Sequence, residues 1–194
     1  MPIKVLTTQI ARLFLALLLG NLVGLATFAF YWTVVTAMKI WELKIEVDFV
    51  SIHDISYSPT LALFMFGGSI IAGLIFNMLE GPRSHGPADL MVSIRKEELP
   101  NLRGGFITSL LTIVSVSSGS SVGLFGPIIH FGGCIAAALE RLFKLLSRGV
   151  ILAAGGAAGI AALFSAPIAA CIFAHEMLLR RFRSSESAPV VMAA

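Results

Sequence analysis

The feature that most constrains this sequence is an apolar run, residues 13–38, without a single charged side chain. A helix needs about 20 such residues to cross the hydrocarbon core of a bilayer, which is about 30 Å thick. The rest of the chain is of the same kind, since 57% of all residues are hydrophobic and 13% are charged. Soluble domains carry about 25% charged residues. The sequence therefore predicts a multi-pass integral membrane protein of the all-α class, with the lipid bilayer as its main solvent.

Charge in the loops indicates how the chain is oriented. A second apolar run, residues 59–79, follows an acidic loop and precedes a mixed loop, residues 80–103, that is rich in Lys and Arg. Basic loops stay on the cytoplasmic side of a membrane. Because Lys4 and Arg12 precede the first run, we expect a cytoplasmic amino terminus and a location in the cell (inner) membrane.

Beyond Arg103 the apolar pattern is interrupted. Residues 104–139 are uncharged, but Ser and Gly at 115–121 and Gly and Pro at 123–127 break any helix there. A later uncharged stretch is broken by Pro167. Irregular backbone at membrane depth is tolerated only where it is buried in protein or lines a cavity. Paired interruptions of this kind favour a transport site.

The Gly and Pro residues at 123–127 form a candidate anion site. We expect a helix to begin within a residue or two of Phe125, with its amino end buried inside the protein. The first N–H groups of a helix, together with the helix dipole, bind anions without a cationic side chain. Small residues allow close approach to these groups. The alternative is a Gly/Pro kink in an ordinary packed helix.

Three motifs, in order and at matching spacing, resemble the CLC family of chloride channels and chloride–proton antiporters. Gly123-Leu124-Phe125-Gly126-Pro127 stands where the family has Gly-Arg-Glu-Gly-Pro. A Gly/Ala-rich segment ending in Ser165-Ala166-Pro167, followed by an apolar helix that ends at Glu176, resembles the family's next motif. Residues 83–88 stand in the place of its Gly-Ser-Gly-x-Pro loop. The resemblance runs from about residue 13 to the last residue.

This resemblance implies a fold and an assembly. Residues 1–194 would be the amino-terminal half of a CLC-type transmembrane domain, with tilted and broken helices forming one half of an inverted repeat. The carboxy-terminal half would be a missing partner outside this chain. The resemblance also implies a homodimer with one pore per subunit, in which residues 160–179 and 188–194 are available to the partner. The transported species would be chloride or another small anion, without a cofactor.

Two departures from the family pattern concern proton transfer. Phe125 replaces the gating glutamate and Leu124 the arginine before it. Met177, beside the retained Glu176, falls where proton-coupled members carry a second, inner glutamate. Neither Phe125 nor Met177 can carry a proton. We therefore expect a channel-like anion pathway without proton coupling, in which Phe125 occupies the gate position.

The inner anion site has two alignments. Matching Pro87 to the motif's proline places Ser84 at the anion-coordinating serine. Matching the downstream segment without a gap places His85 there instead, and we favour His85 because Gly86 then matches the motif's second glycine. A loop histidine at the membrane surface is the alternative. The predicted anion-binding residues are Ser84, His85, Gly86, Leu124, Phe125 and Gly126.

Other classes of function have less support. No catalytic set is predicted, and His175-Glu176 lacks the second histidine of a zinc-binding helix. Basic and aromatic residues are not interleaved as in nucleic-acid-binding grooves. A non-conducting or degenerate membrane subunit stays open as an alternative. An intramembrane serine hydrolase would pair a serine of 117–121 with His130 or His175, since nucleophilic serine needs a base within hydrogen-bond reach.

Overall fold

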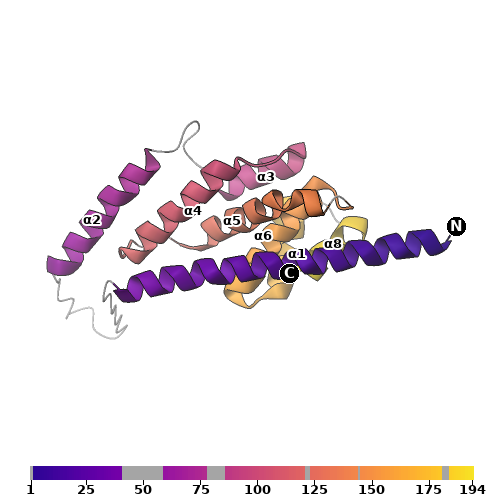
Figure 1. The fold of residues 1–194 in the computed structure, drawn as a ribbon, viewed down its shortest axis with the longest axis horizontal. Helices are drawn as coiled ribbons and strands as arrows, with labels where there is room; N and C mark the ends of the chain where they lie inside the picture. Colours follow the sequence, from indigo (N-terminus) through magenta and orange to yellow (C-terminus); the bar gives the residue numbers. More distant parts are fainter. Residues whose placement is uncertain (1, 41–58, 78–85, 121–122, 144, 181–183) are drawn as a thin grey trace.

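The computed structural model describes residues 2–40, 59–77, 86–120, 123–143, 145–180 and 184–194. Within these residues every regular element is helical, which confirms the predicted all-α class (Figure 1). In chain order the elements are α1 (Pro2–Ile40), α2 (Pro59–Phe76), α3 (Pro87–Lys96), α4 (Leu102–Ser117), α5 (Phe125–Ala138), the 3-10 turn η1 (Glu140–Leu142), α6 (Arg148–Phe164), α7 (Pro167–Phe173), the π-helical η2 (Ala174–Leu179) and α8 (Ser184–Ala193).

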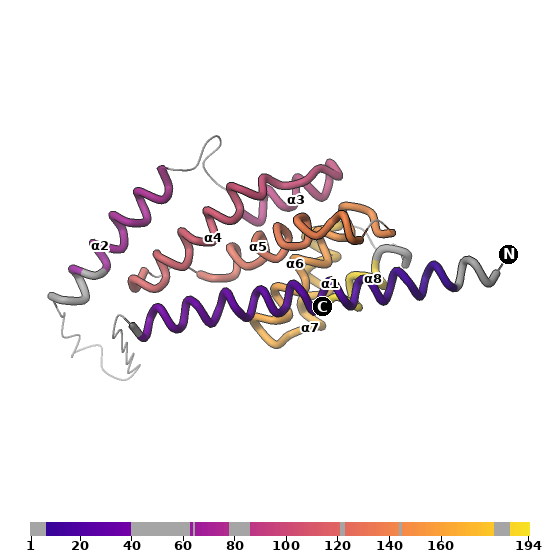
Figure 2. Tube along the Cα trace, in the orientation of Figure 1, coloured from indigo at the N-terminus to yellow at the C-terminus, as the bar shows by residue number. Residues whose placement is uncertain are grey.

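The long helix α1 is apolar on all of its faces. Residues at helical spacing, among them Leu19, Val23 and Val34, are buried against α4, α5, α6 and α8. Phe14 and Leu25 on the other faces are more than 60% exposed. A helix that is apolar all round suits lipid on one side and protein on the other. The carboxyl end of the described chain returns beside the middle of α1, where Ala193 lies against Gly20 (Figure 2).

At the centre of the fold lies α6, which contacts α1, α3, α5, α7, η2 and α8. Every residue from 149 to 161 is buried, although most of them are Gly and Ala. Small side chains let neighbouring helices approach closely on all sides, which is how helices associate in membranes. The Gly/Ala-rich composition of this segment therefore makes α6 the core helix.

Only one described helix segment, Thr7–Lys39, is long and apolar enough by itself to cross a bilayer. Five further described segments are shorter apolar helices of 10–17 residues, among them Leu102–Ser117 and Phe125–Ala138. The expected second run, 59–79, is represented by α2, which packs against α4 at one edge of the fold (Figure 1). Among the described residues, the predicted interruptions at 115–121 and at Pro167 separate α4 from α5 and α6 from α7.

The expectation for residues 80–103 was wrong. Residues 80–103 were expected to be a loop, but 87–96 form α3. Its start follows standard capping, since Pro87 occupies the first turn and the amide N–H of Gly86 donates to Asp89 Oδ2 at 3.1 Å. Burial of Leu90 and Ile94 holds the helix against the core formed by α5 and α6.

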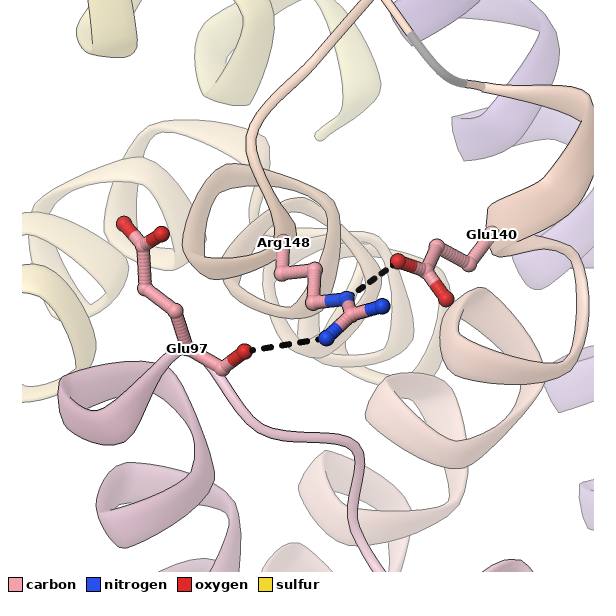
Figure 3. A network of polar contacts seen from close by, with 3 residues as sticks. All are labelled: Glu97, Glu140 and Arg148. Atoms are coloured by element: carbon pink, nitrogen blue, oxygen red, sulfur yellow. Dashed lines mark hydrogen bonds and ion pairs between the residues drawn. The ribbon is translucent and has the colours of Figure 1, made fainter.

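A polar network links three segments at one end of α6 (Figure 3). The Arg148 Nε group donates to the carboxylate of Glu140 in η1. Its Nη1 group donates to the carbonyl oxygen of Glu97, just after α3, at 3.5 Å. Arg148 therefore ties the first turn of α6 to η1 and to the connection between α3 and α4.

Candidate anion-binding site

The predicted helix start at Phe125 is confirmed, because α5 begins at that residue. Ahead of it, α4 ends at Ser117 and the chain turns through Gly119, whose φ of 92° lies in the left-handed region that glycine tolerates. The first intrahelical bond of α5 runs from the N–H of Ile128 to the carbonyl oxygen of Leu124 at 3.1 Å. The interruption seen in the sequence thus separates two helices instead of kinking one.

The first turn of α5 offers N–H groups that its own helix cannot satisfy. The initial N–H groups of an α-helix lack an intrahelical acceptor. Here these groups belong to Leu124, Phe125 and Gly126, while Pro127 has no N–H. The helix dipole places a partial positive charge at the same end. This turn can therefore accommodate a small anion by backbone contacts alone.

A second helix amino end lies beside it. A Cβ atom added to Gly126 would lie 3.5 Å from Cγ and 3.6 Å from Cδ of Pro87, the first residue of α3. Gly86, the residue that caps α3, is therefore brought close to Gly126 although 40 positions separate them in the sequence. The other two predicted residues of the inner site, Ser84 and His85, lie outside the described residues.

The expected burial of the α5 amino end is not found in this chain. Gly123 is exposed and Phe125 is 44% exposed. The reason is that the described helices pack against this turn from limited directions, with Pro87 near Gly126 and aromatic side chains near Phe125. The convergent helix ends therefore lie at a surface of the described chain.

Sequence reasoning missed two residues that contact Phe125. Its ring centroid lies 5.9 Å from that of Phe164 in a tilted arrangement and 5.5 Å from that of Phe173 in an edge-to-face arrangement. Phe164 ends α6 beside the break at Pro167, whereas Phe173 is the last residue of α7, where the chain continues directly into η2. The position of Phe164 beside the predicted break at Pro167 was the available signal, and no such signal marked Phe173.

The residue at the position of the family's inner glutamate is also apolar in this structure. Met177 lies in η2 and is 43% exposed. Beside it, His175 is buried and its Nδ1 group donates to the carbonyl oxygen of Cys171 at 2.8 Å. Helices of π type occur often at functional sites. The segment expected to move protons in coupled relatives thus presents a thioether here.

The other polar residues considered in the sequence pack within the helices. The hydroxyls of Ser117 and Ser118 donate to the carbonyl oxygens of Val114 and Ser115 in their own helix. These two hydroxyls therefore bond within their own helix and not to the histidine base that a serine hydrolase would need. His130 is buried, with Nδ1 3.7 Å from the Cys134 Sγ.

Comparison with known proteins gives consistent matches. The family described as "Voltage gated chloride channel" matches residues 67–194. The voltage-gated ClC-type chloride channel ClcB of Salmonella typhi is 29% identical over 191 residues, which cover 94% of this chain and 45% of that protein. The protein of the same name from Escherichia coli K12 is 28% identical over 131 residues, covering 66% of this chain and 31% of that protein. The chain thus spans about half the length of the Salmonella relative.

Proposed function

Because the chain belongs to the voltage-gated chloride channel family, we propose that it is the amino-terminal half of a membrane pathway for chloride or another small anion. The observation that carries this proposal is the convergence of two helix amino ends at Pro87 and Gly126. At α3 the N–H of Gly86 already donates to the Asp89 carboxylate, so the N–H groups open to an anion are those of α5, and the dipole of α3 adds to theirs. The proposed anion-binding residues are Ser84, His85, Gly86, Leu124, Phe125 and Gly126.

Coordination by backbone N–H groups suits transport because it binds the anion and still allows its release. Conduction requires that binding be favourable enough to admit the ion and weak enough to release it. An arginine or lysine at this depth would hold the anion by a full charge, whereas Leu124 and Phe125 supply only their N–H groups. Gly126 has no side chain to block the approach of the anion to the backbone.

The anion moves downhill without exchange for protons. In the proposed pathway, Phe125 takes the place of a carboxylate that would compete with the anion and carry a proton. Met177 takes the place of the second proton carrier. A phenyl ring and a thioether have no titratable proton, so neither of these two positions can relay one.

The proposed partners are a carboxy-terminal half and a second copy of the complete protein. The exposed amino end of α5 would be covered by the other half. Apolar residues of the late helices are open to a partner copy, with Ile168 76%, Ile172 50% and Val191 54% exposed. These side chains lie within the segments, 160–179 and 188–194, that the family resemblance assigns to a dimer interface.

The test uses the full-length protein in lipid vesicles with an outward chloride gradient. Chloride efflux is followed with an electrode, and internal pH with a trapped dye. We expect chloride efflux without sustained uphill proton movement. Proton movement driven by chloride would contradict the uncoupled pathway. Vesicles that release no chloride, even with Phe125→Ala, would favour the non-conducting subunit instead.

A further inference from the structure

The three rings around the gate position come from three different helix ends. Phe125 is the first residue of α5, Phe164 the last of α6 and Phe173 the last of α7. The Phe125 ring contacts both of the others, at centroid distances of 5.9 and 5.5 Å. The Phe125 ring beside the first interruption is therefore in contact with Phe164 beside the second interruption and with Phe173 at the far end of α7.

The backbone around the rings fixes where they stand. Between α6 and α7, Ser165 adopts a left-handed conformation with φ of 52°, and Pro167 starts the next helix with its restricted φ. This short turn sets the direction of α7, and α7 in turn sets the position of Phe173 relative to Phe164. Phe125 stands on the first turn of α5, whose packing against α6 fixes its distance from them.

We infer that Phe164 and Phe173 are positioning residues that hold the Phe125 ring over the amino end of α5, so that the three rings form a hydrophobic gate. This inference rests on the proposed anion pathway and adds how that pathway closes. Apolar constrictions gate by excluding water, because an ion cannot pass where its hydration is lost without replacement. In the complete protein, where the carboxy-terminal half covers this surface, an anion reaches the N–H groups of Phe125 and Gly126 only when the Phe125 ring moves aside.

The Phe125 ring can move aside only by losing its contacts with the Phe164 and Phe173 rings. Tilted and edge-to-face ring pairs are stabilising beyond their buried area. Each such pair shifts an open–closed equilibrium by roughly 2- to 10-fold. With two pairs on Phe125, the closed arrangement is favoured, and the resting pathway conducts slowly.

The flux experiment uses full-length protein in vesicles with the variants Phe164→Leu and Phe173→Leu. Leucine keeps an apolar side chain of similar bulk but removes the ring. We expect chloride flux to rise roughly 2- to 10-fold in each variant. The matched control is Phe106→Leu, because Phe106 also makes an edge-to-face pair, with Phe131 at 6.3 Å, and is 43% exposed. Flux in the control is expected to stay unchanged.

A double-variant series separates positioning from a general loosening of the structure. In the Phe125→Ala background no ring is left to hold, so adding Phe164→Leu is expected to leave flux unchanged. An equal rise in both backgrounds, or no rise in either single leucine variant, would overturn the gate.

A second measurement does not depend on conduction. Fluorinated phenylalanine placed at position 125 reports ring motion by its NMR line shape. We expect faster ring motion in Phe164→Leu and Phe173→Leu and no change in Phe106→Leu. An unchanged signal in both leucine variants would overturn the positioning role even if the protein conducts no anion. Absence of flux in every variant, including Phe125→Ala, would overturn the proposed function and the gate together.

Discussion

Gly132 of α5 and Gly155 of α6 face each other where the two helices cross. A Cβ atom on Gly155 would lie 2.6 Å from the carbonyl oxygen of Gly132, and one on Gly132 would overlap the carbonyl of Gly155. No side chain fits at either position without moving a backbone. This crossing brings α5, which carries the candidate site, against the buried helix α6 and so fixes the position of the site relative to α6.

The first prediction follows from this crossing. Gly132→Ala should separate α5 from α6 and destabilise the protein by about 1–3 kcal/mol, the usual cost of overpacking. Thermal unfolding of the full-length protein in detergent measures the effect. The control is Gly73→Ala on α2, where nothing lies within 4 Å of the added methyl group. That change should be neutral or stabilise by up to about 1 kcal/mol. Equal melting temperatures for both variants would refute the close crossing.

The second prediction concerns the backbone N–H groups of the candidate site. Gly126→Ala places a methyl group 3.5 Å from the Pro87 ring, an ordinary contact, so the fold should be kept. The methyl group should nevertheless hinder an anion at the first turn of α5. Hydrogen bonds to charged groups contribute about 1.5–3 kcal/mol, so losing one should lower chloride flux roughly tenfold or more.

The control for this variant is again Gly73→Ala, which should conduct as the unchanged protein does. Melting temperatures are measured beside the fluxes, because a misfolded Gly126→Ala variant would also conduct poorly. Normal flux in a well-folded Gly126→Ala protein would place the anion elsewhere.

The long uninterrupted features of the fold could be read from the sequence. α1 follows from an apolar run without charges, and the helix start at Phe125 follows from the Gly and Pro residues around it. α3 was missed because Arg95 and Lys96 suggested an exposed loop. The signals for its start were present, since Gly86, Pro87 and Asp89 occupy the positions that cap a helix.

The candidate site could be predicted only in part, because its geometry depends on tertiary contacts. The proximity of Pro87 to Gly126 joins segments far apart in the chain, and no local pattern encodes it. The same is true of the ring contacts between Phe125, Phe164 and Phe173. Exposure of the α5 amino end depends on which helices pack around it, and the sequence motif describes only the helix itself.

The third prediction concerns the polar network at the start of α6. Arg148→Gln removes the ion pair with Glu140 and the contact with the Glu97 carbonyl. Because the arginine side chain is 49% exposed, solvent screens the pair and the loss of stability should be small. The melting temperature should fall at low salt and the difference should shrink at about 1 M salt. A loss that does not change with salt would mean that packing of the side chain, not its charge, stabilises the junction.

The last prediction concerns pH and the histidine proposed at the inner anion site. At the proposed site, His85 as a neutral imidazole would donate one N–H to an anion, and the protonated ring would add a positive charge that attracts it. Chloride flux should therefore rise as pH falls through about 6.5, the ordinary pKa of histidine. His85→Gln keeps an N–H donor but cannot be protonated, so flux should persist and lose its dependence on pH. The control is His130→Gln, since His130 is enclosed between α4 and α5 and lies against Gly105. Flux measured between about pH 5.5 and 7.5 distinguishes the two variants. Acid stimulation that survives His85→Gln would assign the response to another group and favour Ser84 at the inner site.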